Sequence, residues 1–128
     1  MKMIRLEELQ VYRVSMDIGE MVWKIVERWS YYQKDTLGKQ MIRSADSIAL
    51  NISEGYGRYH FGENRQFCWY SRGSAFETST AIKKAKQRNL VSTEEYEILK
   101  AKLILYFKLI NSYIKSIGNT GTVPNKRR

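Results

Sequence analysis

The sequence has few of the residues that interrupt helices or cross-link small folds. Its single proline, Pro124, lies near the C-terminus, so no upstream segment is prevented from being helical by proline. Cys68 is the only cysteine, which excludes an internal disulfide and a cysteine-based metal cluster within one chain. This cysteine content fits a reducing, intracellular setting.

Long apolar runs are also absent. The longest uninterrupted run, residues 103–107, is far too short to span a bilayer. The N-terminal stretch MKMIRLEELQ lacks the apolar segment of a signal peptide. We therefore expect a soluble cytoplasmic protein without a membrane partner. At 128 residues it has room for one domain with a real core.

Patterns that would indicate catalysis are scarce. The phosphate-binding patterns GxGxxG and GxxxxGK[ST] do not occur, and the only histidine, His60, follows a glycine rather than a glutamate at three residues' distance. This spacing excludes the Glu-x-x-His pairs of a di-iron bundle. Glu54 and Glu77 could form an acid–base pair, although bundle carboxylates more often neutralise an arginine. We predict no enzymatic activity, no cofactor, no metal and no small-molecule substrate, with Cys68 as a packing residue.

Apolar residues recur at intervals of three and four along four segments, which predicts four amphipathic helices at about 6–32, 36–54, 62–88 and 93–117. Asp35 is the expected N-cap of the second helix, and Ser92 with Glu95 forms a capping-box pattern before the last. Such helices, joined by short connections, form an antiparallel up-down-up-down four-helix bundle. We therefore predict an all-α domain over residues 1–118 and a disordered basic tail over 119–128.

Along one face of the second expected helix the residues are polar, whereas the buried face of a helix is normally apolar. If the second and third helices form a hairpin, Arg43 comes near Glu77 and Asn51 comes opposite Ser71. We predict an internal polar network here, with Gln40, Arg43, Ser47, Asn51, Glu54, Ser74 and Glu77 as its members. The alternatives are that this line faces a ring lumen, a contact surface or solvent.

The charge balance favours a polyanionic partner. The chain has 22 basic and 13 acidic residues, a net charge of +9, which suits RNA, DNA or an anionic membrane surface. On the third expected helix, cations for phosphates alternate with rings for base stacking. The candidate nucleic-acid-binding residues are Arg58, Arg65, Trp69, Arg72, Lys83 and Lys86. The alternative is that Trp69 and Phe76 pack against a helix or a second subunit.

Three stretches carry a family resemblance: LGKQMIRSADSIALNISEGYGR, ENRQF and SRGSAFET. They resemble the four-helix-bundle proteins first known from intervening sequences in bacterial 23S ribosomal RNA genes, over roughly residues 9–117. The resemblance implies an up-and-down bundle that assembles as a ring, typically a homopentamer, without established enzymatic activity. The same fold is similar to that of the accessory variability proteins of diversity-generating retroelements, which are basic pentamers that bind a reverse transcriptase and its template RNA.

Two functional hypotheses follow. In the first, the protein is a basic oligomeric scaffold that binds structured RNA, ribosomal or retroelement, through phosphate contacts. In the second, it is a protein-interaction scaffold, such as an accessory subunit that docks a reverse transcriptase.

Overall fold

The computed structural model describes residues 4–118 and is helical throughout. Its four long helices are α1 (Gln10–Glu27), α3 (Lys39–Tyr56), α4 (Phe61–Gln87) and α5 (Thr93–Ser116); shorter segments are the 3-10 turn η1 (Leu6–Glu8), the helical turn α2 (Tyr31–Gln33) and the π-helical turn η2 (Lys34–Gly38). No strand occurs among these residues, so the prediction of an all-α fold with four long helices is confirmed for the described part. The tail expected at 119–128 lies outside it.

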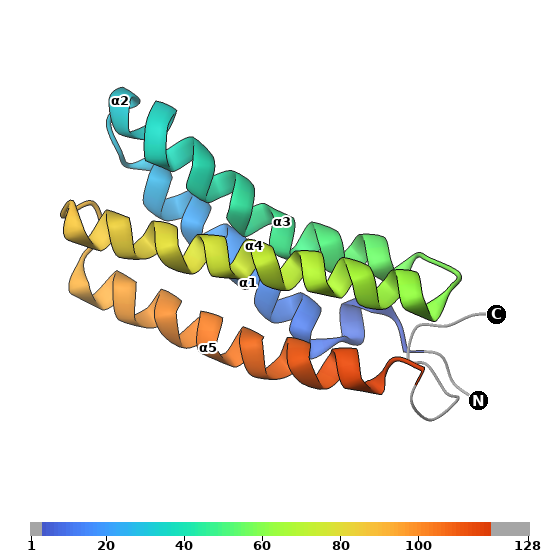
Figure 1. Ribbon diagram of the computed structural model, residues 1–128. Coiled ribbons are helices and arrows are strands. Elements are labelled where there is room, and N and C mark those ends of the chain that lie inside the picture. The colour runs from blue at the N-terminus through green and yellow to red at the C-terminus, as the bar shows by residue number, and fades with distance from the viewer. Residues whose placement is uncertain (1–3, 119–128) are drawn as a thin grey trace.

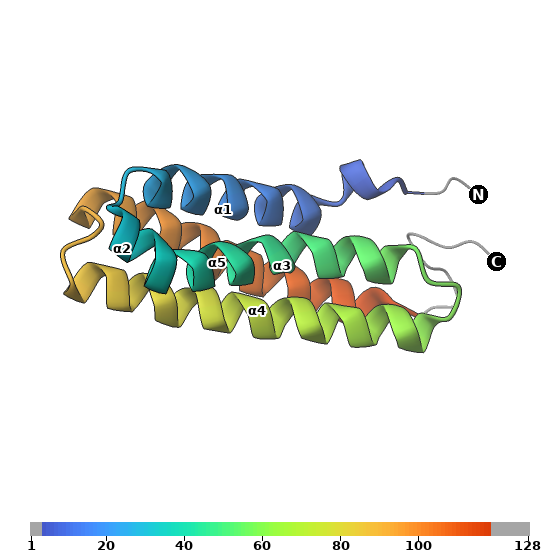
Figure 2. The ribbon, with the colours of Figure 1, turned by 90° about the horizontal axis from the view of Figure 1, so that it is seen from above.

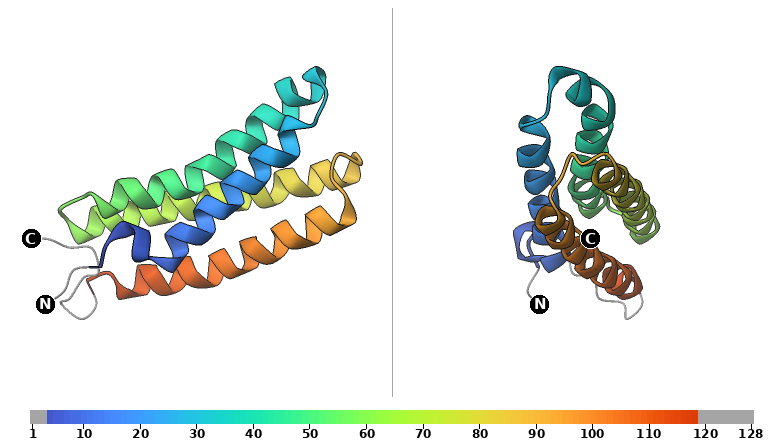
Figure 3. Two further views of the ribbon diagram at one scale, coloured as in Figure 1. Left: turned by 180° about the vertical axis from the view of Figure 1, so that it is seen from behind. Right: turned by 90° about the vertical axis from the view of Figure 1, so that its left-hand side faces the viewer.

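The four long helices pack around a common core in the order α1, α3, α4, α5, and α5 closes the arrangement against α1. Figures 1 and 2 show α3 and α4 side by side, with the turn at residues 57–60 joining them at one end. At the other end, which carries α2, the pair α1 and α3 diverges from the pair α4 and α5 (Figure 3). The outer faces of these two pairs therefore point to opposite sides of the molecule.

The helix that contains α3 begins earlier than the sequence predicted. Ser30 is its N-cap: the Ser30 hydroxyl accepts a hydrogen bond from the Gln33 backbone N–H at 3.3 Å, and the Gln33 side chain accepts one from the Ser30 N–H at 3.0 Å. The prediction that Asp35 caps this helix is wrong, since the Asp35 carboxylate pairs with Lys39 at 3.1 Å. Residues 31–35, expected as a connection, are helical, and α1 ends at Glu27 instead of extending to residue 32.

The core combines large aliphatic side chains from three helices with small side chains from α4. Val22 of α1, Ile48 of α3 and Leu99 of α5 are fully buried. The buried residues of α4 are Asn64, Cys68, Ser71, Ala75, Thr78, Ala81, Ile82 and Ala85. Because most of these side chains are short, α4 approaches α3 closely. This approach brings the hydroxyl groups of α4 into contact with the helices on either side.

Both ends of α5 are defined by local chemistry. The predicted capping box is present: the Ser92 hydroxyl accepts a hydrogen bond from the Glu95 backbone N–H, and the Glu95 carboxylate accepts one from the Ser92 N–H, both at 3.0 Å. Two orphan amides at the helix start are thereby satisfied. At the other end Gly118 has a φ of 76°, a conformation that glycine adopts at little cost.

Candidate nucleic-acid interface

Positive charge is concentrated on one half of the molecule. Residues 61–116, which include α4 and α5, contain ten lysines and arginines against five glutamates, a surplus of five. Residues 4–60 contain eight basic and eight acidic residues, so their net charge is zero. Within the described residues, the whole surplus therefore lies on the α4–α5 half. A surface dominated by one sign of charge attracts ligands of the opposite sign.

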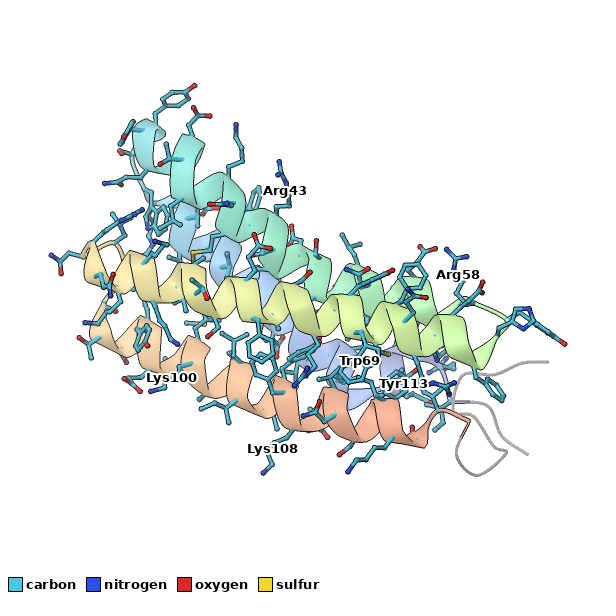
Figure 4. The ribbon with its side chains drawn as sticks, viewed as in Figure 1. Arg43, Arg58, Trp69, Lys100, Lys108 and Tyr113 are labelled. Carbon is cyan, nitrogen blue, oxygen red and sulfur yellow. The ribbon has the colours of Figure 1, made fainter. Side chains whose placement is uncertain are left out.

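Two aromatic side chains and an arginine form a partly exposed stripe on α4, along its border with α5. Trp69 and Phe76 are both about half exposed. The guanidinium of Arg72 lies between them, 5.3 Å from the Trp69 ring and 5.2 Å from the centre of the Phe76 ring. Figure 4 shows Trp69 where α4 faces α5. We call Trp69, Arg72 and Phe76 the aromatic stripe; it includes two of the predicted nucleic-acid-binding residues, Trp69 and Arg72.

Beside the aromatic stripe, a shallow groove of about 130 Å³ runs between α4 and α5. Lys83 of α4 and Lys100 of α5 line it, together with the rings of Tyr96 and Phe107, and no carboxylate is among its lining residues. The ring centroids of Phe76 and Phe107 are 4.5 Å apart, so the stripe and the groove adjoin. We call this the lysine groove. Lys100 comes from α5 and Lys83 from α4, so their shared position in this groove depends on the packing of α5 against α4.

Arg58 and Arg65 are engaged within the molecule. The Arg58 guanidinium pairs with the Glu54 carboxylate at 2.7 Å and lies 4.8 Å from the centre of the Phe67 ring. Arg65 donates a hydrogen bond to the carbonyl oxygen of Ile117 at 2.9 Å, where its charge also opposes the negative end of the α5 dipole. The structure thus gives both arginines intramolecular partners, whereas Lys83 is exposed and Lys86 half-buried at the C-terminal end of α4.

The internal polar network predicted from the sequence does not form within the chain. Gln40, Arg43, Glu54 and Glu77 are exposed, and Figure 4 shows Arg43 pointing away from the bundle. Ser47, Asn51 and Ser74 are half-buried, and the Asn51 amide donates a hydrogen bond to the Ser47 carbonyl oxygen of its own helix at 2.9 Å. The prediction is wrong because α4 is rotated so that Ala75 and Thr78, rather than Glu77, face inward.

The buried polar side chains that join neighbouring helices are hydroxyls, which lie beside the residues of the predicted network. The hydroxyls of Ser44 and Thr78 are 2.9 Å apart, which joins α3 to α4. The Ser71 hydroxyl donates to the Ile48 carbonyl oxygen at 2.8 Å and lies 2.6 Å from the Tyr106 hydroxyl of α5. Burial raises the pKa of Tyr106, so its hydroxyl stays protonated. The sequence signal for these contacts was the pair of small hydroxyl residues Ser71 and Thr78, which lie seven positions apart on α4.

Ser71→Ala is expected to lower the free energy of unfolding by about 1–2 kcal/mol, because the buried Tyr106 hydroxyl loses its partner. Tyr106→Phe should cost less, about 1 kcal/mol, since the Ser71 hydroxyl keeps its bond to the Ile48 carbonyl oxygen. Urea denaturation of both single variants and the double variant measures the coupling between the two sites. Strictly additive losses would contradict a direct hydrogen bond.

The side chains that the sequence offers as candidates for catalysis or metal binding lie apart from one another. Cys68 is fully buried, and burial raises the pKa of its thiol to about 12, so the nucleophilic thiolate does not form near neutral pH. His60 is exposed in the turn before α4. Glu54 and Glu77 are both exposed, on different helices. Among the described residues, no three His, Cys, Asp or Glu side chains gather as a metal site would require.

Comparison with known proteins finds a matching family. None of the described helices has the length and apolar character needed to cross a membrane. A search of curated proteins finds no match. Residues 7–112 match the family model for 23S rRNA-intervening sequence proteins, and this span includes α1, α3, α4 and most of α5. The chain therefore belongs to the family of 23S rRNA-intervening sequence proteins.

Proposed function

We propose that this protein is a non-enzymatic, basic scaffold that binds structured RNA in the cytoplasm through phosphate contacts. The RNA is ribosomal or derived from a retroelement. The same positive charges would bind DNA more weakly, because the shape of DNA differs from that of the structured RNA. The subunit is an up-down-up-down bundle, and the working form is a homo-oligomeric ring, in our proposal a pentamer. The family name, with its reference to 23S rRNA, is consistent with an RNA partner.

The observation that carries the proposal is the uneven distribution of charge. The α4–α5 half has the entire positive surplus of the described residues, and cations line the groove between its two helices. Phosphate contacts by lysine and arginine release counterions from a nucleic acid, which supplies most of the sequence-independent affinity. If the positive surplus were spread evenly over the bundle, it would indicate a role in solubility rather than a face that binds a polyanion.

The α1–α3 half offers one surface for ring assembly. Met16 and Leu50 are exposed apolar side chains beside a groove of about 310 Å³, which the carboxylates of Glu20 and Asp46 also line. Burial, with a smaller contribution from Glu20, raises the pKa of Asp46. Because this half has no net charge, copies meeting here do not repel one another. A closed ring needs two different complementary surfaces, and this groove would supply one of them.

The test combines mass measurement with RNA titration. Light scattering of protein purified at high salt should give the mass of an oligomer. A hairpin RNA should then bind with an affinity that falls log-linearly as salt rises from about 50 to about 200 mM. An absence of RNA binding at the lower salt concentration, with the protein folded and oligomeric, would refute the proposal.

A second function is favoured by the same α1–α3 groove. Its mixture of exposed apolar side chains and carboxylates suits a protein partner that presents a basic segment, such as a reverse transcriptase docked by an accessory subunit. A protein that forms the ring yet ignores RNA at low salt would favour this alternative. A reverse-transcriptase gene and a template repeat beside the gene for this chain would support its retroelement form.

A further inference from the structure

We infer that the α4–α5 face binds unpaired nucleotides, whose bases stack on Trp69 and Phe76 while their phosphates contact Lys83 and Lys100. This inference rests on the proposed RNA binding and names the part of a structured RNA that the protein selects: a loop, bulge or single-stranded end. The two rings and Lys83 come from α4, and Lys100 comes from α5. Neither helix alone would present the whole surface.

The two rings of the aromatic stripe are available to a ligand. Trp69 is 50% exposed and Phe76 is 52% exposed, although both are large apolar side chains. They are seven residues apart on α4, so they lie on one side of the helix, about 10 Å apart along its axis. Exposed rings in one line along a helix form a platform on which successive bases can stack.

Arg72 completes the platform between the rings. Its guanidinium is within 5.3 Å of the Trp69 ring and 5.2 Å of the Phe76 ring centroid. Among the described residues no carboxylate pairs with it, and its Nε is buried without a hydrogen-bond partner. The side chain is therefore held by packing against the rings, and its positive charge is not neutralised within the chain. A planar cation in this position can stack on a base or bind a phosphate.

The lysine groove extends the same surface toward the C-terminal end of α4. Phe107 lines this groove and touches Phe76, so the ring platform leads directly into it. Lys83 and Lys100 border the groove from opposite helices, and the Lys100 ammonium lies 5.9 Å from the centre of the Tyr96 ring. With no carboxylate lining the groove, two ammonium groups face it uncompensated. The sugar-phosphate backbone of an RNA strand whose bases stack on the two rings would then contact the ammonium groups of Lys83 and Lys100 one after the other.

Unpaired nucleotides use all of these groups, whereas a duplex uses only the cations. In A-form RNA the bases are stacked and paired, and the major groove is too narrow for side chains to read. A duplex on this face would contact the lysines through its phosphates and leave the two half-exposed rings in water. Unpaired bases can turn outward and cover the rings, which gains stacking in addition to phosphate contacts.

Charge argues against a second copy of the chain on this face. Two α4–α5 halves, each with a surplus of five positive charges, would repel one another if they met. The α1–α3 half, where the net charge is zero and the groove contains carboxylates, is the better protein-binding surface. We therefore expect the ligand of the aromatic stripe to be a polyanion whose aromatic bases are exposed.

The experiment compares two labelled RNAs by fluorescence anisotropy: an unstructured strand of about 12 nucleotides and a hairpin stem with the same number of phosphates. The unstructured strand should bind more tightly. Trp69→Ala should weaken its binding roughly 5- to 100-fold and leave hairpin-stem binding unchanged, while Trp69→Phe, which keeps a ring, should restore most of the affinity. Trp23→Ala is the matched control, since Trp23 is a 51% exposed tryptophan on α1, and it should change neither affinity.

A second measurement does not depend on removing Trp69. In a Trp23→Phe variant Trp69 is the one exposed tryptophan of the described chain, because Trp29 is buried, and its emission should change with the unstructured strand but not with the stem. Equal affinity for both RNAs, unaffected by Trp69→Ala, would overturn this inference and leave phosphate-mediated RNA binding intact. A change of oligomer mass in Trp69→Ala would assign the stripe to a subunit contact and also overturn it. Failure to bind either RNA at low salt would refute the proposed function as well.

Discussion

Replacing Lys83 and Lys100 together by glutamate is expected to weaken binding of single-stranded RNA roughly 25-fold at about 0.1 M salt, because each phosphate contact contributes about 0.7 to the logarithmic salt slope. The slope itself should fall by about 1.4, since two phosphates would no longer have a lysine partner. Both lysines border the lysine groove, and no carboxylate there already neutralises them. Titrations at several salt concentrations measure affinity and slope together.

The matched control changes the same number of charges on the opposite half. Lys24→Glu with Lys39→Glu gives the protein an identical net charge, but both positions are exposed on the α1–α3 half. If binding depends on the α4–α5 face, the control should retain most of its affinity and its salt slope. Equal reductions in affinity for the two double variants would mean that only the total charge matters, and the assignment of a binding face would fail.

Gly55→Ala is expected to lower the free energy of unfolding by about 2 kcal/mol and the melting temperature by about 8 °C. An added Cβ would lie 2.7 Å from the Asn64 Oδ1, 2.9 Å from the Phe67 Cβ and 3.0 Å from the Asn64 carbonyl oxygen. Since two of these atoms cannot move without the α4 backbone, the helices must separate. This overpacking cost exceeds the gain of about 1 kcal/mol in helix propensity.

Gly73→Ala provides the control for propensity. Gly73 is an exposed glycine of α4, and nothing lies within 4 Å of where its Cβ would be. This variant should be more stable than the natural sequence by up to about 1 kcal/mol. Thermal unfolding followed by circular dichroism compares the two. A neutral or stabilising Gly55→Ala would show that α3 and α4 can move apart there without cost, contrary to the close packing described.

The helices themselves were predictable because their signals are local. Periodic apolar residues located α1 and α5, although α1 covers only Gln10–Glu27 of the predicted span 6–32. Ser92 with Glu95 marked the start of α5 through two hydrogen bonds. The start of the second helix was missed because two acceptable caps, Ser30 and Asp35, lie five residues apart. Ser30 prevails since Gln33 completes its capping box, and the intervening residues continue as helix through a π-helical turn.

The inward side of α4 was harder to predict. Its buried side chains are mostly small, while the large side chains of Trp69 and Phe76 are half exposed. Hydrophobic periodicity therefore does not distinguish Ala75 and Thr78, which are buried, from Ser74 and Glu77, which are not. A rotation of one position along the helix separates the predicted polar network from the observed hydroxyl contacts. The rotation is decided by which side chains fit against both α3 and α5, and that is a property of three helices together.

The sequence by itself determined the helical class, the net charge, the lack of catalytic and metal-binding patterns, and the family, because each depends on composition or on short-range spacing. Only the tertiary structure decided where individual cations lie and which of them have partners within the chain. Packing directs the Arg58 and Arg65 guanidinium groups to partners within the chain and brings Lys83 and Lys100, seventeen residues apart, to one groove. The physical reason is that burial and juxtaposition depend on how neighbouring helices are rotated against one another, which no single helix specifies.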